Sequence, residues 1–353
     1  MKQLSAIMDP VFIQPSSYPW PDRFFLQFIK DKRDLPFIYL TLRITFFMVP
    51  LGILLFMPFV SGWLWWAIAV AYAWLNNFVF KGPFGLMLHC TSHRILFKKK
   101  YKVLNYFLPW VIAPFFGHSP DTYFSHHIGM HHAENNMEDD ESSTMPFQRD
   151  SIKDFSKYFF TFLFMGVYNL ASYFYYKKRK RLFYRTVRGE IFFIFFCVGM
   201  SFVNFMATLW VFIIPFFIYR LIAMMGNWAQ HAFIDPAQPD NEYKNSITCI
   251  NTKYNVKCWN DGYHISHHEK QTMHWTEHPV HFEKTIDNYV RGHAIVFDGI
   301  HFLHVFIWLM AKRYDLLARN FVNIGNQYNN EEEVITLLKT RTQKIIFNQK
   351  LSI

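Results

Sequence analysis

Three short stretches of the chain are unusually rich in histidine. They read HCTSH at residues 89–93, HHIGMHH at 126–132 and HISHH at 264–268. Neutral imidazole is the commonest protein ligand for borderline metal ions such as iron and zinc. The three stretches are therefore candidate metal-binding segments, provided that the fold brings them together.

The spacing within each stretch suits ligands on one face of a helix. On a helix, His89 and His93 lie on the same side about one turn, ~6 Å, apart. His264 pairs in the same way with His267 or with His268. The central stretch repeats the pattern. Its smallest set of candidate ligands is His127, His131 and His132, and His126 is a possible alternative ligand.

The number of histidines predicts more than one ion. A tetrahedral zinc ion takes only four ligands, and the three stretches offer at least eight. A site built of imidazoles without cysteine thiolates argues against an iron–sulfur cluster and against a closed structural zinc site. Two neighbouring redox-active ions beside a lipid-facing cavity suggest activation of O2 for attack on a hydrophobic substrate.

The composition predicts an integral membrane protein. Of the 353 residues, 52% are hydrophobic and 41 are phenylalanine. No Asp, Glu, Lys or Arg occurs from Ile44 to Phe80, a run that fits two membrane spans of ~20 residues each. A tight turn at Ser61-Gly62 would join the two spans.

A second uncharged run suggests a second hairpin, with a turn near Ala207, although one long tilted helix is the alternative. The predicted fold is thus an all-α membrane protein with four transmembrane helices in two hairpins and a cytosolic helical cap that carries the histidine stretches. The predicted spans are 37–60, 63–88 and the two halves of 191–226. Three further apolar segments are predicted to lie at the interface or periphery: 103–117, 155–176 and 294–311.

The formal charge of +10 comes from basic residues that flank the apolar runs. We read them as topology signals and lipid-surface contacts rather than as a nucleic-acid site. The runs KKKYK (98–102) and KKRKR (177–181) are expected to face the cytosol, which places every histidine stretch at the cytosolic face. Nothing divides residues 1–353 into separate domains, and the four cysteines are expected to be reduced.

The order of the histidine stretches resembles the membrane fatty acid desaturase superfamily. Its three boxes are HxxxH or HxxxxH, then HxxHH or HxxxHH, then (H/Q)xxHH. The family adds a histidine just after the last span, with an asparagine four residues before it, and NWAQH supplies His231 and Asn227 in this spacing. The resemblance covers about residues 37–310. The box spacings differ from those of the acyl-CoA Δ9 enzymes.

The resemblance implies a di-iron centre with nine histidine ligands. The first ion would take His89, His93, His127, His132 and His267. The second ion would take His131, His231, His264 and His268, with Asn227 holding a water on one ion.

The function implied by the resemblance is insertion of a double bond into a lipid acyl chain with O2. An acyl-lipid, sphingoid or carotenoid hydroxylase or ketolase of the same superfamily is the alternative. A zinc-binding receptor or transporter is a more distant alternative, because a protein of that kind is expected to carry ionisable groups along its membrane spans. No GxGxxG fingerprint occurs, so electrons are expected from a partner protein. The resemblance implies that this partner is cytochrome b5 or a ferredoxin. The expected location is the endoplasmic reticulum if the source is eukaryotic.

Arg220 and two tryptophans have two interpretations each, and two further segments have an expected position. Arg220 could bind an acyl head group or snorkel to the interface. Trp228 and Trp275 could line an acyl tunnel or belong to an interfacial belt. The acidic run MEDDE (137–141) is expected to be a solvated loop, and the histidines of HWTEHPVH (274–281) are expected to surround the site or lie at the surface.

Overall fold

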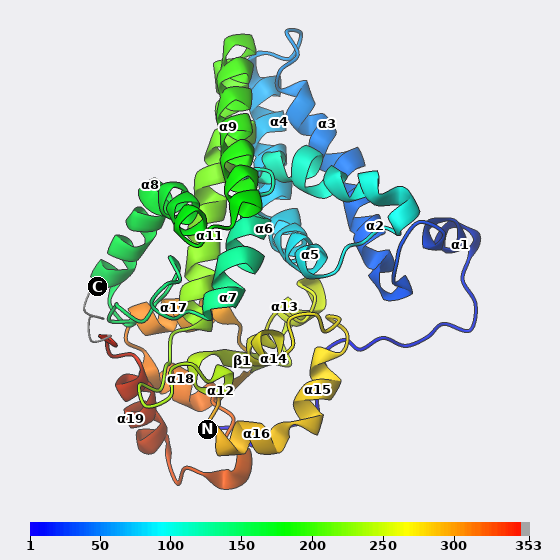
Figure 1. Cartoon of the computed structure of the whole chain (residues 1–353). Helices are drawn as coiled ribbons and strands as arrows, with labels where there is room; N and C mark the ends of the chain where they lie inside the picture. Colours follow the sequence, from blue (N-terminus) through cyan, green and yellow to red (C-terminus); the bar gives the residue numbers. More distant parts are fainter. Residues whose placement is uncertain (347–353) are drawn as a thin grey trace. The chain divides into compact units, whose positions relative to one another are not determined.

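The computed structural model describes residues 1–346, and these are mostly helical (Figure 1). Internal contacts divide the chain into two compact units. Unit 1 comprises Met1–Val11, Met130–Asn169 and the chain from Ile222 onward. Unit 2 comprises Phe12–Gly129 and Leu170–Leu221. Three helical segments continue from one unit into the other: η7 (His127–His131), α8 (Ile152–Tyr176) and α11 (Ile214–Gln230).

Unit 2 is helical, and several of its helices contain π-helical turns. Its N-terminal part contains α1 (Trp20–Leu26), η1 (Lys32–Asp34), α2 (Leu35–Arg43), η2 (Ile44–Met48), α3 (Val49–Leu54), α4 (Gly62–Trp74), η3 (Leu75–Phe80) and α5 (Lys81–His93). The rest contains η4 (Lys99–Tyr106), η5 (Leu108–Ile112), η6 (Ala113–Phe116), α6 (Thr122–His126), α9 (Lys180–Val203), α10 (Phe205–Thr208) and η8 (Leu209–Ile213).

The predicted turn at Ser61-Gly62 is present. Helix α4 begins at Gly62, whose φ of 58° is a left-handed value that glycine adopts without a Cβ clash. Helices α3 and α4 pack against each other, and a Cβ at Gly52 would lie 3.1 Å from the ring of Tyr72. A small residue in α3 therefore lets the two helices approach closely.

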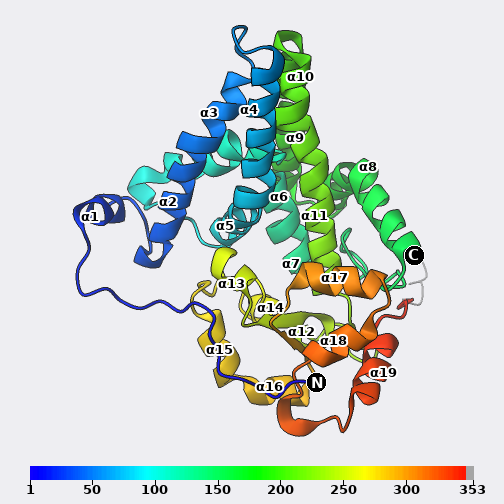
Figure 2. The same cartoon turned by 180° about the vertical axis from the view of Figure 1, so that it is seen from behind.

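The second turn lies at Asn204, three residues before the predicted position. Asn204 is extended (φ −160°), and its side chain accepts a hydrogen bond from the backbone N–H of Ala207 at 3.0 Å. Helix α9 runs antiparallel to the helix that follows it (Figure 2). The ring centroids of Phe193 and Phe216 lie 5.5 Å apart, and those of Phe196 and Phe212 lie 4.9 Å apart. The alternative of one long helix is therefore wrong.

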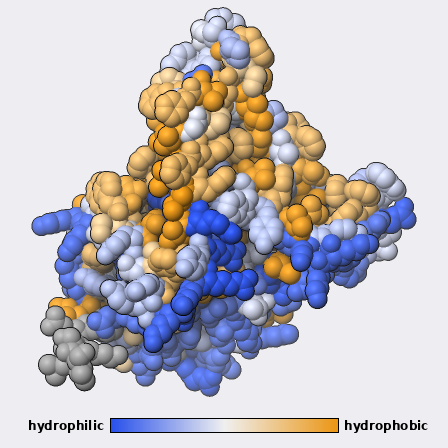
Figure 3. Space-filling view, turned by 45° about the horizontal axis from the view of Figure 1, so that its top comes forward, coloured by the Kyte–Doolittle hydropathy of each residue, from blue (hydrophilic) through white to orange (hydrophobic). Residues whose placement is uncertain are grey.

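Three helices within residues 1–346 are long and apolar enough to cross a membrane. They are Lys32–Leu54, Lys180–Val203 and Phe205–Gln230, with 23, 24 and 26 residues. The predicted span 63–88 is helical but is not one of the three, because its tryptophan, tyrosine and asparagine residues lower its mean hydropathy. Large apolar side chains are nevertheless exposed along it. Figure 3 shows that hydrophobic residues gather on one part of the visible surface and hydrophilic residues on another.

Two glycines of α9 offer a matched test of its packing. A Cβ at Gly189 would lie 1.7 Å from the carbonyl oxygen of Pro120, whereas a Cβ at Gly199 would meet nothing within 4 Å. We expect Gly189→Ala to destabilise the protein by about 2–4 kcal/mol. Gly199→Ala should be neutral or stabilise by up to ~1 kcal/mol through helix propensity. Thermal unfolding in detergent measures both, and equal shifts would contradict this packing.

Unit 1 combines short helices with one small sheet, which corrects the all-α expectation. Strands β1 (Ile247–Ile250) and β2 (Ile295–Asp298) are parallel, with Ile247 opposite Ile295. The predicted peripheral segment 294–311 therefore forms β2 and α17 (Phe302–Met310), and both contribute to a buried core. The other helices are α7 (His132–Glu134), α12 (Glu242–Asn245), α13 (Lys253–Lys257), α14 (His264–Glu269), α15 (His278–Lys284), α16 (Ile286–Arg291), α18 (Tyr314–Asn320), η9 (Ile324–Asn326) and α19 (Glu331–Arg341).

Arg149 ties the segments of unit 1 together. Its side chain is fully buried and donates hydrogen bonds to the carbonyls of Ala232 at 3.1 Å, Thr144 at 3.2 Å and Arg341 at 3.0 Å. A buried guanidinium that is fully hydrogen-bonded orders the backbone around it. The chain immediately after α11 is held in this way.

Candidate metal centre

Four histidines of unit 1 turn their ring nitrogens toward one another. One ligand atom from each lies within 4.8 Å of the others, and no side chain is more than 5% exposed. The Nε2 of His264 lies 3.1 Å from the Nε2 of His231 and 3.1 Å from the Nε2 of His268. The members of this four-histidine group are His131, His231, His264 and His268.

Local structure explains how these side chains meet. Helix α14 presents His264 and His268 one turn apart on a single face, as the sequence predicted. His231 directly follows α11, and its backbone N–H still donates to the carbonyl of Asn227 at 3.1 Å, so one more helical turn positions it. His131 ends η7.

The outward nitrogens of three of these rings have hydrogen-bond partners. Nδ1 of His131 lies 2.7 Å from Oδ2 of Asp140, and Nδ1 of His268 lies 3.0 Å from Oδ1 of Asn135. Nδ1 of His231 lies 3.0 Å from the carbonyl of Asn245. Because these oxygens accept a hydrogen bond from Nδ1–H, the lone pair of each ring is left on the inward-facing Nε2.

Burial also keeps the group in its ligating form. Burial is the main cause that lowers the pKa of His231 to about 3, and the charge of His131 adds to it. Burial and the neighbouring histidines likewise hold the pKa of His264 well below its usual range. Both imidazoles are therefore neutral at pH 7, which is the protonation state that metal ions require.

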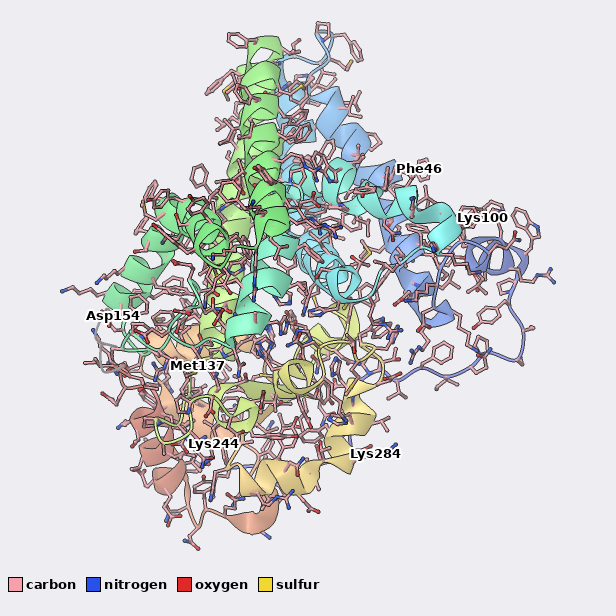
Figure 4. All side chains as sticks on the ribbon, viewed as in Figure 1. Phe46, Lys100, Met137, Asp154, Lys244 and Lys284 are labelled. Carbon is pink, nitrogen blue, oxygen red and sulfur yellow. The ribbon has the colours of Figure 1, made fainter. Side chains whose placement is uncertain are left out.

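Asp140 is the residue that sequence reasoning missed most clearly. It belongs to the run MEDDE, which follows α7 and includes Met137 (Figure 4). Instead of being solvated, the Asp140 side chain is fully buried and accepts hydrogen bonds from the backbone N–H and hydroxyl of Ser142, at 2.8 and 2.7 Å. The solvated-loop expectation is therefore wrong for Asp140, while the neighbouring Asp139 is exposed.

Asn227 lies in α11, one turn before His231. Its side-chain amide donates to the hydroxyl of Tyr158 at 2.8 Å and to the carbonyl of Ser142 at 2.9 Å. The Tyr158 hydroxyl in turn donates to the carbonyl of Ser142 at 3.1 Å. This network fixes the orientation of the Asn227 amide, and neither Tyr158 nor Ser142 carries a sequence signal that points to the site.

The remaining predicted ligands form two smaller sets. In unit 1, Nε2 of His267 lies 2.8 Å from Nε2 of His132. In unit 2, α5 presents His89 and His93 on one face. Nε2 of His93 lies 3.0 Å from Nε2 of His127, and the ring centroids of His89 and His127 are 4.4 Å apart.

The ambiguity between the tandem histidines of the central stretch is thereby resolved within unit 2. His127, rather than His126, is grouped with His89 and His93. The following glycine has a packing role, because a Cβ at Gly129 would lie 2.9 Å from the side chains of Phe174 and Leu182.

The other candidates have structural surroundings. Trp228 is fully buried in a hydrophobic core, and its indole N–H donates to the carbonyl of Arg149 at 2.9 Å. Trp275 is half-buried, with its ring centroid 5.3 Å from that of Trp259. Arg220 is half-buried, and its guanidinium lies 3.3 Å from the Glu190 carboxylate.

Two of the three histidines of HWTEHPVH contact the helix that carries candidate ligands. Nδ1 of His278 lies 2.8 Å from the hydroxyl of Ser266, in α14 between two predicted ligands. His281 pairs with Glu269, the last residue of that helix, at 2.8 Å. His274 lies 2.9 Å from the hydroxyl of Thr276. The contacts of His278 and His281 brace α14, whereas that of His274 is local.

The donor set fits a borderline metal ion. It consists of four imidazoles, three of which have a hydrogen-bonded outer nitrogen, and the cysteines lie outside both histidine groups. Four imidazoles without a thiolate or carboxylate ligand suit iron or zinc better than calcium or magnesium, which take oxygen ligands.

Comparisons with known proteins give one match. The family model described as fatty acid desaturase matches residues 75–299, which is more than half of the 353-residue chain and includes all nine predicted ligands and Asn227. No curated protein and no solved structure matches the chain significantly. The chain therefore belongs to the fatty acid desaturase family, whose members are oxidoreductases.

Proposed function

We propose that this protein is a lipid desaturase that inserts a double bond into a fatty acyl chain with O2 and two iron ions. The observation that carries the proposal is the buried four-histidine group of unit 1, in a chain of the fatty acid desaturase family. Side-chain acid–base chemistry cannot break an unactivated C–H bond, so the bound iron ions would supply the oxidising chemistry.

The proposed ligands follow the division that the family resemblance implies. His131, His231, His264 and His268 would hold one ion, and Asn227 would hold a water beside an ion. The other ion would take His89, His93, His127, His132 and His267. Asp140, Asn135 and Asn245 would keep the rings of the first set in the tautomer that ligates.

The proposed setting is a membrane whose cytosolic face carries the site. The three apolar helices support membrane association, and the helix 62–93 would serve as the fourth span. Helix α8 exposes Phe160, Phe164 and Tyr168 along one side, as expected of an interfacial helix. The electron donor would be cytochrome b5 or a ferredoxin, and the membrane would be the endoplasmic reticulum in a eukaryote.

The test combines metal analysis with lipid profiling. We expect purified, detergent-solubilised protein to contain about two iron ions per chain. In a host that lacks the activity, its expression should produce a lipid that is two hydrogens lighter than its precursor. A product that gains one oxygen would identify the hydroxylase of the same superfamily. One zinc ion or none, with no new lipid, would refute the proposal.

A further inference from the structure

Unit 2 contains a cluster of charged side chains that the metal site does not use. Lys81 begins α5, Glu190 lies in α9 and Arg220 lies in α11. Lys81 and Glu190 are buried, with Lys81 only 3% exposed, and the Arg220 side chain is 11% exposed. Ionisable groups within apolar helices are costly, and they usually mark a functional site.

Arg220 is balanced within this cluster, but Lys81 is not. The Arg220 guanidinium lies 3.3 Å from the Glu190 carboxylate and 3.5 Å from the ring centroid of Phe216. The amino group of Lys81 has no hydrogen-bond partner among residues 1–346, and it lies 5.8 Å from the ring centroid of Phe116. A buried ammonium group without a partner requires an acceptor, preferably one with a negative charge.

His118 brings a further donor to the same place. It is 3% exposed, its ring centroid lies 3.5 Å from that of Tyr219, and its Nε2 has no hydrogen-bond partner in the described chain. Burial, and then the nearby charges of Lys81 and Arg220, lower the pKa of His118. His118 is therefore neutral at pH 7 and able to donate one hydrogen bond.

Buried hydroxyl groups in this part of unit 2 are also unsatisfied. Within residues 1–346, the hydroxyls of Ser119 and Thr186 are buried and make no hydrogen bond. Buried polar groups in folded proteins nearly always have a partner, so a concentration of unsatisfied groups indicates a bound molecule.

We propose that Lys81, with His118 and Arg220 beside it, binds the carboxylate of an unesterified acyl chain. With Lys81 protonated by pairing with a bound carboxylate, Lys81 and Arg220 would carry two positive charges and Glu190 one negative charge, so the single negative charge of that carboxylate would complete the balance. Coenzyme A and phospholipid head groups are too large for a place where Lys81 is 3% exposed. The inference rests on the proposed function, because it takes the acyl chain as the substrate.

The position of Lys81 on α5 connects this site with the predicted metal ligands. His89 follows Lys81 by eight residues on the same helix, which is roughly 12 Å along its axis. An acyl chain held by its carboxylate at Lys81 would extend along α5 toward His89. The carboxylate would thus set the distance between the head group and the carbon atoms that react.

The test compares binding of radiolabelled stearic acid and methyl stearate to the purified full-length protein in detergent. We expect the acid to bind at least tenfold more tightly than the ester. Lys81→Met should abolish this preference, and Lys81→Arg should retain most of it. Lys100→Met is the control, because Lys100 is an exposed lysine of the same unit (Figure 4). If Lys81→Met does not fold, His118→Gln should reduce the preference at least threefold.

Three results would overturn the inference: equal binding of acid and ester, a preference that survives Lys81→Met, or tighter binding of stearoyl-CoA than of stearate. If millimolar acetate displaced stearate, the site would be a general one for small carboxylates and not a site for acyl chains. Iron content is measured on the same samples. A protein that prefers stearate but holds no iron would refute the proposed function and leave the carboxylate site standing.

Discussion

Replacing His264 with alanine is expected to lower the iron content from about two ions per chain to about one and to abolish product formation. His264 is 2% exposed, and its Nε2 lies 3.1 Å from the Nε2 atoms of both His231 and His268. Its removal leaves three imidazoles that no longer enclose an ion. We expect a loss of activity of at least about 1,000-fold, as for other residues that act as one unit.

The control for this substitution is His304→Ala. His304 is exposed at the start of α17 and belongs to neither histidine group. Iron content is measured by mass spectrometry on purified protein, and activity by the yield of the lipid product. If His264→Ala retained full iron content and activity within twofold of the wild-type value, His264 would not be a metal ligand.

Asp140→Asn is expected to weaken iron binding by about 10- to 100-fold without unfolding the protein. The Asp140 carboxylate accepts a hydrogen bond from the Nδ1–H of His131 at 2.7 Å, and this tautomer leaves the Nε2 lone pair of the ring able to ligate. An asparagine of the same size can present an N–H to the ring instead. This would favour the tautomer whose Nε2 carries the proton, which cannot bind a metal ion.

The control for Asp140→Asn is the neighbouring Asp139→Asn. Asp139 is exposed and carries the same charge, so its replacement should leave iron retention unchanged. Retention is measured during titration with a chelator, with the thermal unfolding temperature followed in parallel. Equal behaviour of the two variants would show that the contact between Asp140 and His131 does not orient the ligand.

Much of the candidate site could be predicted from the sequence. The pairs His89 and His93, and His264 and His268, depend only on the helical period, which places residues four apart on one face. The short spacing from Asn227 to His231 likewise needs only one helical turn. The prediction that the chain carries long apolar helices also follows from local composition, because uncharged runs of this length must avoid water.

Other features could not be predicted, because they depend on contacts between residues far apart in the sequence. Periodicity does not indicate that β1 pairs with β2, since a short apolar run fits a buried helix or a strand equally well. Helix boundaries also shifted, and the second turn lies at Asn204 rather than Ala207. The residues at which helices begin and end depend on side-chain hydrogen bonds, which the hydropathy pattern does not show.

The sequence by itself determined the types of the candidate ligands, their spacing and the apolar helices beside them, because these properties repeat over a few residues. Only the tertiary structure decided which groups surround the ligands. In that structure Asp140 is buried against His131, and His127 rather than His126 is grouped with the histidines of α5. Arg220 pairs with Glu190, whereas Lys81 has no hydrogen-bond partner within residues 1–346. Burial and hydrogen bonding are properties of packed neighbours, and packing joins residues that the linear order keeps apart.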